Sequence, residues 1–221
     1  MIKAVIFDMD GLLIDSEPLW REAMIEIFNK VGVPMTWESA QQTMGLRTDE
    51  VIAYWYRKYP WEGKSQEEIK EEILQEVDRL AWEKGETLPG VHQTIAFFKE
   101  KKLPMALASS SPMQLITSFV KKMGIGAHLQ ILRSGMQEEY GKPHPSVFIS
   151  TAKELGVHPD ECLVFEDSFH GLVAAKAAKM LAVGVPEENM KGNPKFQIAD
   201  VLLNSLEDFN EEVFNTLANQ H

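Results

Sequence analysis

The sequence contains a single cysteine, Cys162, and its 22 lysines and arginines are outnumbered by 33 aspartates and glutamates. One cysteine cannot form an internal disulfide, which is typical of proteins in a reducing compartment. The formal net charge of −11 argues against nucleic acids and anionic membranes as partners. The sequence also lacks a hydrophobic run of membrane-spanning length and a recognisable signal peptide. We therefore expect a cytoplasmic protein without a membrane partner.

The length and composition are those of an ordinary globular protein. With 221 residues, 44% hydrophobic and 25% charged, the chain can form one large domain or a core with an insertion. Its negative charge would repel an anionic substrate at long range. A phosphate site would therefore need local positive charge, a metal ion or oriented amides. We expect a monomer.

The N-terminal segment combines a buried strand with two carboxylates. Residues 2–7 are almost continuously apolar, which predicts a strand buried on both faces. Asp8, Asp10 and Gly11 follow it, and the carboxyl ends of strands are where open α/β sheets bind ligands. A polar turn that merely ends the strand is the structural alternative. An EF-hand loop is excluded because Leu19 stands at the twelfth position, where a glutamate is required.

The next segment, from about residue 16 to residue 86, is helical in pattern throughout. We expect helices at 16–31, at 36–44 with an end at Gly45, at 48–59, and after the capping box that begins at Ser65. Several aromatic residues of this segment are expected to form the core of a helical bundle: Trp37, Trp55, Tyr56 and Trp82.

Beyond residue 87, helices and strands alternate. We expect helices at 91–102, 112–123, 145–155 and 171–179, and strands at 104–108, 128–132, 162–165, 181–185 and 201–203. This alternation predicts an α/β fold, a Rossmann-like, doubly wound parallel sheet with helices on both faces. The sheet core would comprise residues 1–15 and 87–221, and residues 16–86 would be an all-helical insertion after the first strand.

Polar clusters follow several predicted strands or begin a helix. They are Asp8 with Asp10, Ser109 with Ser110, Lys142, and Glu166 with Asp167. Because parallel strands end at one edge of a sheet, these groups can converge there. Taken singly, each has a structural explanation, since serines and acids cap helices and a lysine beside prolines is usually a solvated loop residue.

Convergence of the acids would have a chemical consequence. Two carboxylates about 4 Å apart repel by roughly 4 kcal/mol at an effective dielectric constant near 20. Three or four of them need a cation, and hard oxygen ligands select Mg²⁺ or Ca²⁺. Mg²⁺ commonly binds one or two carboxylates together with substrate phosphate. This pattern favours a reaction at phosphorus, for which aspartate is a known nucleophile.

At this point the sequence resembles the haloacid dehalogenase-like phosphohydrolases. The motifs of that family occur in order along the chain as Asp8-Met9-Asp10-Gly11, Ser109, Lys142 and Glu166-Asp167. The resemblance implies that Asp8 is the nucleophile and Asp10 the general acid and base. It also implies that Ser109 binds the phosphate and that Lys142 neutralises the pair formed by the nucleophile and the phosphate.

The same resemblance implies a magnesium site. Asp167 would hold Mg²⁺ together with Asp8 and the backbone carbonyl of Asp10, and Glu166 would support them. The helical insertion resembles the small cap domain of the β-phosphoglucomutase-like branch, whose motion would admit the substrate and then exclude solvent. Asp10 favours phosphoryl transfer, since true dehalogenases lack an aspartate at this position.

Other residues are candidates for substrate binding, namely Gly11, Trp20, Arg47 and Ser110. Arg47 stands where β-phosphoglucomutase-like proteins carry a phosphate-gripping arginine, although a surface arginine at a helix start is the alternative. Trp20 stands where the mutases carry a histidine, and an indole cannot relay a proton. The segment from Asp8 to Trp20 is similar to phosphatases that act on 2-deoxyglucose 6-phosphate and hexitol phosphates.

We therefore predict a Mg²⁺-dependent phosphatase that hydrolyses small phosphorylated sugars or polyols through an aspartyl-phosphate. A phosphomutase of the β-phosphoglucomutase type is the first alternative, because it would return the phosphoryl group to a sugar. A binding module without catalysis is the second. Phosphonate hydrolysis is the third, and it would need a Schiff-base lysine that the sequence does not place in the site.

Overall fold

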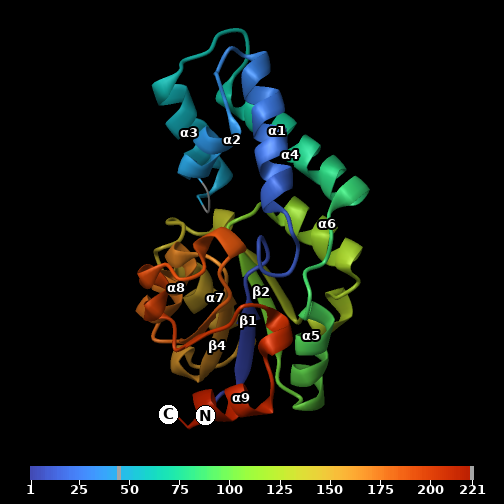
Figure 1. Ribbon diagram of the computed structural model, residues 1–221, viewed down its shortest axis with the longest axis vertical. Coiled ribbons are helices and arrows are strands. Elements are labelled where there is room, and N and C mark those ends of the chain that lie inside the picture. Colours follow the sequence, from blue (N-terminus) through green and yellow to red (C-terminus); the bar gives the residue numbers. More distant parts are fainter. Residues whose placement is uncertain (44–45, 220–221) are drawn as a thin grey trace.

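A single parallel sheet forms the centre of the protein. The computed structural model describes residues 1–43 and 46–219, and within them the strand order is β3-β2-β1-β4-β5-β6 (Figure 1). The strands are β1 (Ala4–Phe7), β2 (Met105–Ser109), β3 (Ile131–Ser134), β4 (Cys162–Glu166), β5 (Leu181–Gly184) and β6 (Val201–Leu202). All neighbouring pairs are parallel. This confirms the predicted fold class.

Helices cover both faces of the sheet, as the alternating pattern predicts. On one face lie α5 (Val91–Glu100) and α6 (Met113–Met123), and on the other lie α7 (Ser146–Leu155) and α8 (Phe169–Ala177) (Figure 1). Successive side chains of a strand point to opposite faces. Accordingly, Phe7 packs in the apolar cluster that includes Phe98 of α5, and Ile6 packs in the cluster that includes Phe148 of α7.

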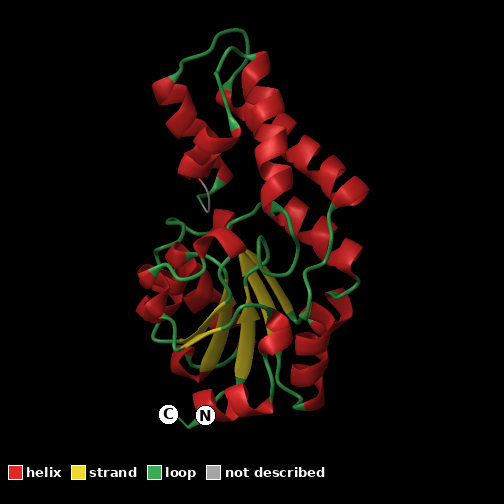
Figure 2. Cartoon of the chain, viewed as in Figure 1, coloured by secondary structure: helices red, strands yellow, loops and turns green. Residues whose placement is uncertain are grey.

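A helical insert, which we define as residues 17–84, lies beyond the carboxyl ends of the strands (Figure 2). It consists of α1 (Glu17–Lys30), the single turn α2 (Trp37–Ala40), the 3₁₀ turn η1 (Gln41–Thr43), α3 (Thr48–Lys58) and α4 (Gln66–Lys84). Many of its apolar side chains are buried between these helices. Trp55 and Phe28 are fully buried, with ring centroids 6.3 Å apart.

Two chain segments join the insert to the sheet and pair with each other. Ile14 and Thr87 form an antiparallel bridge, and the amide of Asp15 donates to the carbonyl of Glu86 at 2.9 Å. The amide of Leu88 donates to the carbonyl of Leu13 at 3.0 Å. The entrance and exit of the insert are therefore held side by side.

Some predicted elements differ from the structure in extent. The helix expected at 36–44 is only α2 followed by η1, and its predicted end at Met44 and Gly45 lies outside the described residues. The strand expected at 128–132 is β3, three residues later, because its pairing with β2 aligns Ile131 with Ala106. His128 belongs instead to the 3₁₀ turn η2 (Gly126–His128).

Two aromatic residues are not in the core of the insert, contrary to the prediction. Trp37 and Trp82 are 44% and 47% exposed, whereas Trp55 is buried. Trp82 lies near the end of α4, where its indole N–H donates to the hydroxyl of Ser118 on α6 at 2.7 Å. The ring of Trp37 lies 5.1 Å from the Arg21 guanidinium. Trp37 and Trp82 thus lie at the surface of the insert, where they contact polar side chains rather than the apolar core.

The C-terminal helix α9 (Glu211–Ala218) was not predicted. Asn210 caps it by accepting hydrogen bonds from the amides of Glu212 and Val213, and Leu217 is its buried residue. The helix lies near the N-terminus, at the end of the molecule opposite the insert (Figure 1). The remaining 3₁₀ turns are η2 (Gly126–His128), η3 (Gly135–Gln137), η4 (Pro159–Glu161), η5 (Glu188–Met190), η6 (Pro194–Ile198) and η7 (Leu206–Asp208). Among the described residues, no helix has the length and apolar character needed to cross a bilayer.

We predict that Phe98→Ala lowers the free energy of unfolding by about 3–5 kcal/mol, because it removes a fully buried ring from the sheet–helix core. Phe98 contacts the rings of Phe7, Phe165 and Phe209 at centroid distances of 6.1, 5.7 and 5.3 Å. Urea unfolding measures the loss. The control Ile149→Ala, at a 42% exposed position, should stay within about 0.5 kcal/mol of wild type. Equal losses in the two variants would contradict this description of the core.

Candidate active site

The ends of β1 and β4 bring three carboxylates together. These strands pair with Phe7 opposite Phe165, so Asp8 and Glu166 lie at neighbouring positions where the strands end. The amide of Asp8 extends the ladder by donating to the carbonyl of Phe165 at 3.0 Å. Asp167 follows directly, and all three acids are buried. The predicted convergence of these acids at one edge of the sheet is therefore present.

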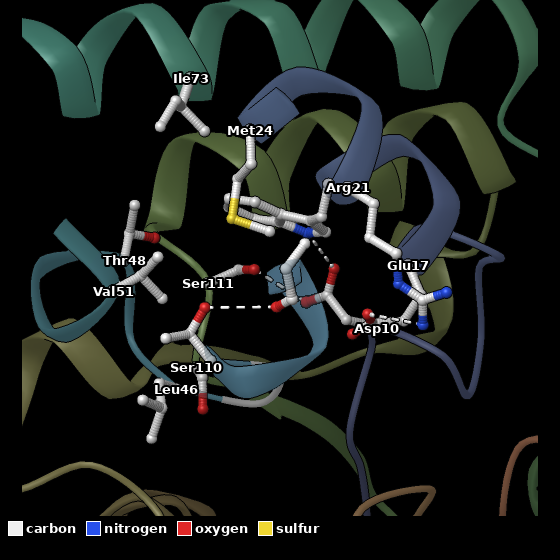
Figure 3. Close-up of a pocket in the computed structure, with 13 residues that line it drawn as sticks. Asp10, Glu17, Arg21, Met24, Leu46, Thr48, Val51, Ile73, Ser110 and Ser111 are labelled. Atoms are coloured by element: carbon white, nitrogen blue, oxygen red, sulfur yellow. Dashed lines mark hydrogen bonds and ion pairs between the residues drawn. The ribbon is translucent and has the colours of Figure 1, made fainter. Parts of the chain in front are cut away.

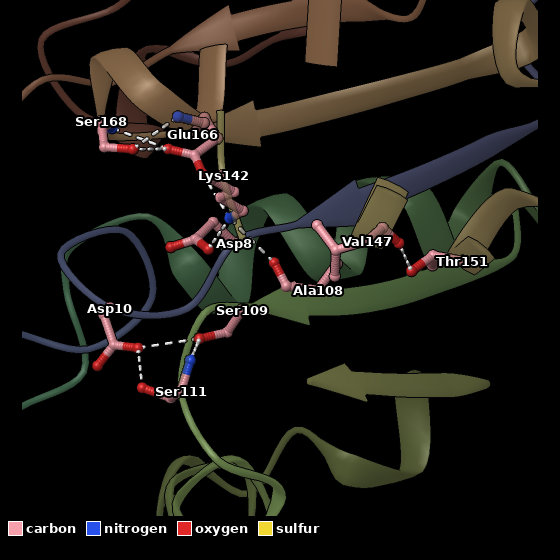
Figure 4. A network of polar contacts seen from close by, with 11 residues as sticks. Asp8, Asp10, Ala108, Ser109, Ser111, Lys142, Val147, Thr151, Glu166 and Ser168 are labelled. Atoms are coloured by element: carbon pink, nitrogen blue, oxygen red, sulfur yellow. Dashed lines mark hydrogen bonds and ion pairs between the residues drawn. The ribbon is translucent and has the colours of Figure 1, made fainter. Parts of the chain in front are cut away.

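Lys142 joins two of these acids. Its ammonium group contacts Asp8 Oδ1 at 2.5 Å and Glu166 Oε1 at 2.6 Å, and it also donates to the carbonyl of Ala108 at 3.3 Å (Figure 4). The other carboxylate oxygen of Glu166 accepts from the amide and the hydroxyl of Ser168, each at 2.8 Å. Lys142 is therefore a buried ion-pair partner, and the solvated loop lysine that the sequence left open is excluded.

Burial and mutual repulsion shape the pKa values of this cluster. Burial raises the pKa of Asp8 to about 7, and the ammonium group of Lys142 opposes that shift. Burial and the neighbouring Glu166 also raise the pKa of Asp167 well above its usual value. Burial would lower the pKa of Lys142, but the carboxylates of Asp8 and Glu166 raise it above its usual value. The single positive charge of Lys142 thus does not balance the negative charges that three ionised carboxylates would carry.

The arrangement fits a hard divalent cation. Asp8, Glu166 and Asp167 each offer one carboxylate oxygen, and these oxygens lie within 4.8 Å of one another. Carboxylate oxygens are the donors that Mg²⁺ and Ca²⁺ prefer. A bound cation would also offset the repulsion that keeps the pKa values of Asp8 and Asp167 high. Among the described residues, this acidic cluster is the one that could hold a metal ion.

Asp10 lies in a separate hydrogen-bond network. Its Oδ1 accepts from the hydroxyl of Ser16 at 2.7 Å and from the indole N–H of Trp20 at 3.1 Å. Its Oδ2 accepts from the hydroxyls of Ser109 and Ser111 at 3.0 and 2.8 Å (Figure 4). Two donors come from the start of the insert and its linker, and two come from the end of β2. The carboxylate is thus held where the insert meets the sheet.

Two pockets meet at Asp10, Glu17 and Ser110. The first, which we call the insert pocket, has a largely apolar wall from the insert that includes Met24, Val51 and Ile73 (Figure 3). The second, which we call the metal-side pocket, has a volume of about 540 Å³ and is lined by residues that include Asp8, Lys142 and Asp167. A ligand placed across their junction would have one end at the acidic cluster and the other against the insert.

Charged side chains of the insert pocket come from the first turns of α1. The Arg21 guanidinium lies 3.9 Å from carboxylate oxygens of both Glu17 and Glu187. Burial and the neighbouring Glu187 raise the pKa of Glu17 to about 8. Glu17 and Arg21 line the insert pocket beside Trp20. This end of the site therefore combines an apolar wall with hydrogen-bonding groups.

Comparisons with known proteins identify the family. Residues 2–179 match the haloacid dehalogenase-like hydrolases. The chain belongs to this family. The hydrolase is 40% identical over 206 residues to hexitol phosphatase B of Escherichia coli K12, covering 93% of each chain. It is 32% identical over 177 residues to the phosphorylated carbohydrates phosphatase of Thermotoga maritima, covering 80% of this chain and 82% of that relative.

Solved structures share the fold of the hydrolase. The phosphate complex of CbbY from Rhodobacter sphaeroides superimposes with a TM-score of 0.85 and 26% identity, covering 94% of this chain and 96% of that chain. The β-phosphoglucomutase of Clostridium difficile has a TM-score of 0.87 at 23% identity, with coverage of 100% and 98%. The second likeness concerns the fold alone.

The remaining predicted site residues take different positions. Trp20 and Ser110 line the insert pocket, while Gly11 packs against Asp167, where a Cβ atom would lie 2.3 Å from Oδ2. Arg47 donates to the carbonyl of Glu138 and pairs with Asp49, both at 3.0 Å. The roles assigned to these residues remain predictions.

Two residues that hold Asp10 were not among the predicted site residues. Ser16 was expected only as the start of a helix, but its hydroxyl donates to Asp10 and makes no cap hydrogen bond. Ser111 follows Ser109 and Ser110, which were predicted, and its hydroxyl also donates to Asp10. Its spacing of two from Ser109 was the available signal, since a turn there presents both hydroxyls to the same carboxylate.

We predict that Gly171→Ala destabilises the hydrolase by about 1–3 kcal/mol. Alanine in a helix normally stabilises by roughly 0.5–1 kcal/mol relative to glycine. At this position, however, a Cβ atom would lie 1.7 Å from Oε1 of Glu166, which is buried and held by Lys142 and Ser168. The clash should outweigh the helix propensity.

Urea unfolding tests this prediction. Gly126→Ala is the matched control, because there the nearest atom to a new Cβ is a Val120 methyl group at 3.3 Å. The control should stay within about 0.5 kcal/mol of wild type. A Gly171→Ala protein more stable than wild type would show that Glu166 is not fixed in this position.

Proposed function

We propose that this hydrolase is a Mg²⁺-dependent phosphatase of small phosphomonoesters, with hexose and hexitol phosphates as its preferred substrates. The observation that carries the proposal is the pairing of Asp8 with Lys142 beside Glu166 and Asp167, in the metal-side pocket that adjoins the insert pocket. The similarity to hexitol phosphatase B over 93% of the chain supports the substrate class.

Asp8 is the proposed nucleophile. Its carboxylate attacks phosphorus, one O–P bond forms, and the bond between phosphorus and the leaving alkoxide oxygen breaks. Lys142 lies 2.5 Å from Asp8 Oδ1, so it holds the nucleophile in place and offsets the negative charge that gathers at the reacting atoms. Amides around Ser109 at the end of β2 are suited to bind phosphate oxygens.

Asp10 is the proposed general acid and base. It gives its proton to the leaving alkoxide and later takes a proton from the water that hydrolyses the aspartyl-phosphate. Hydroxyl groups both donate and accept hydrogen bonds, so Ser16, Ser109 and Ser111 can turn when Asp10 changes its protonation state. The Trp20 indole only donates, and it therefore fixes the position of one oxygen throughout.

Asp8, Asp167 and the backbone carbonyl of Asp10 are the proposed ligands of Mg²⁺, with Glu166 in support. The ion, when bound, would supply positive charge for the phosphate oxygens. The choice of Mg²⁺ rests on these ligands, because all the candidate donor atoms are hard oxygens. We also propose that residues 16–86 act as a cap that covers this site during the reaction.

The insert pocket is the proposed site of the sugar or polyol. Its apolar wall can cover the carbon chain, and Glu17 and Arg21 can exchange hydrogen bonds with hydroxyl groups. A phosphomutase of the β-phosphoglucomutase type is the second candidate, which the shared fold keeps in view. Trp20 argues against it, because the indole at this position cannot carry a proton to a second sugar hydroxyl.

We predict that the purified protein releases inorganic phosphate from hexitol and hexose 6-phosphates, and that removal of Mg²⁺ with EDTA abolishes the release. A phosphate assay over a panel of three- to seven-carbon phosphates, each with and without Mg²⁺, measures this. Isomerised sugar phosphate without free phosphate would favour the mutase instead.

Variants of the two aspartates assign the steps. Asp8→Asn should abolish turnover because an amide cannot attack phosphorus as a carboxylate does, and retained activity would remove Asp8 from the nucleophile's role. Asp10→Asn should lower kcat by about 100- to 10,000-fold, the usual contribution of a general acid and base. Circular dichroism should show both variants folded.

We predict that Mg²⁺ stabilises the protein more at pH 8 than at pH 5. The raised pKa values of Asp8 and Asp167 favour the metal-free fold at low pH, and this contribution is lost as the pH rises, for Asp8 as it approaches about 7. Protons and Mg²⁺ compete for the same carboxylates, so binding of Mg²⁺ strengthens over this interval.

At pH 8, Mg²⁺ at ten times its Kd should raise Tm by roughly 3–6 °C. Differential scanning fluorimetry at both pH values, at one fixed Mg²⁺ concentration, measures the effect. Asp167→Asn should lose most of the shift. An equal shift at pH 5 and pH 8 would place the bound ion away from Asp8 and Asp167.

A further inference from the structure

Arg47 connects the helical insert to the loop that carries Lys142. It stands immediately before α3, and one terminal nitrogen of its guanidinium donates to the backbone carbonyl of Glu138 at 3.0 Å, across 91 positions of sequence. The other terminal nitrogen pairs with Asp49 Oδ2 at 3.0 Å, and Nε lies 3.9 Å from Glu50 Oε1. Protein groups therefore surround the guanidinium, and its side chain is only 13% exposed.

The loop that receives Arg47 is itself fixed to the sheet core. The Glu138 carboxylate accepts from Arg133 Nε of β3 at 2.7 Å and from the hydroxyl of Ser150 on α7 at 3.2 Å. Four residues later, Lys142 reaches Asp8 and Glu166. A shift of this loop would thus change the position of the ammonium group relative to the nucleophile.

Gly141 allows the close contact between the insert and this loop. A Cβ atom at position 141 would lie 2.9 Å from Arg47 Cγ and 3.0 Å from Cδ. These are atoms of the inner part of the side chain, so Arg47 could not avoid the clash by moving its end group alone. The contact thus depends on both residues, and Gly141 is bonded directly to Lys142.

Arg47 is also absent from the walls of both pockets, as far as the described residues define them. Its neighbours Leu46 and Thr48 line the insert pocket, but the Arg47 side chain turns toward Glu138. A phosphate that bound Arg47 through its two terminal nitrogens would have to compete with the Glu138 carbonyl and the Asp49 carboxylate, which already accept hydrogen bonds from them.

We propose that Arg47 is a positioning residue, which seats the helical insert on the loop 138–141 and so holds Lys142 against Asp8 and Glu166. It is not a ligand of the substrate's phosphate. The proposal rests on the proposed phosphatase function, because it assigns Arg47 a part in the rate of that reaction. It differs from the phosphate-gripping role that the sequence resemblance implies for this position.

Steady-state kinetics on two substrates test the proposal. On the proposed function, sorbitol 6-phosphate would place its polyol in the insert pocket, whereas p-nitrophenyl phosphate has no polyol. Arg47→Ala should lower kcat by about 10- to 100-fold on both substrates, because a displacement of about 1 Å at a catalytic group has effects of this size. KM should change less than about 3-fold. Arg47→Lys should restore part of the rate, since one amine can reach the Glu138 carbonyl.

Gly141→Ala provides a second, independent variant. It should lower kcat in the wild-type background but have little further effect in an Arg47→Ala background, because the contact is already lost there. Arg57→Ala is the matched control, an exposed arginine of the same helix, and it should keep wild-type kcat and KM. Thermal melting of every variant separates a loss of rate from a loss of folding.

Each outcome distinguishes the proposal from its alternatives. A rise in KM for sorbitol 6-phosphate alone, with kcat unchanged, would overturn it and restore Arg47 as a substrate ligand. Fully additive effects of Arg47→Ala and Gly141→Ala would overturn it as well. A wild-type protein that hydrolyses neither substrate would overturn the proposed function and this proposal with it, whereas an active wild type with an unimpaired Arg47→Ala variant would overturn this proposal alone.

Discussion

The buried contact of Lys142 with Asp8 and Glu166 is the interaction on which the rest of the site depends. Buried charges are costly unless they are paired, and removing one partner leaves the other uncompensated. Here one ammonium group stands among three carboxylates, so the cluster remains short of positive charge even with the ion pairs made. A bound cation and nearby hydrogen-bond donors would supply the positive charge that the cluster lacks. With a divalent cation bound, the site would attract a phosphate group locally, although the whole chain, with a net charge of −11, repels anions at a distance.

Much of this site follows from sheet topology, which explains why the sequence could predict it. Strands buried on both faces have continuous apolar sequences, and their carboxyl ends share one edge, so Asp8, Ser109 and Glu166 could be placed together without knowledge of any contact. Lys142 has no such signal. Its loop is polar and rich in proline, and only the family resemblance distinguished it from a solvated lysine.

The contacts that sequence reasoning missed depend on where the insert sits. Ser16 was expected only to begin a helix, because local spacing shows where a helix starts, whereas its hydroxyl bonds to Asp10 across a turn. Trp82 looked like a core residue because aromatic side chains are usually buried, but its indole bonds to Ser118 on another element. The helix α9 was missed because only Leu217 is fully buried in it, so its apolar pattern is short. The local periodicity of a sequence does not predict how the insert and the sheet core are placed relative to each other.

The position of the insert is therefore part of the chemistry. Asp10 takes hydrogen bonds from Ser16 and Trp20 on the insert side and from Ser109 and Ser111 on the sheet side, so its carboxylate is fully held only when the two meet. Arg47 makes a second connection of the same kind, on the loop of Lys142. A general acid and a lysine beside the nucleophile would then both reach their places through contacts of the insert. With Asp10 and Lys142 in their proposed roles, this arrangement would favour phosphoryl transfer when the site is covered, and the insert would affect the timing of the reaction as well as the choice of substrate.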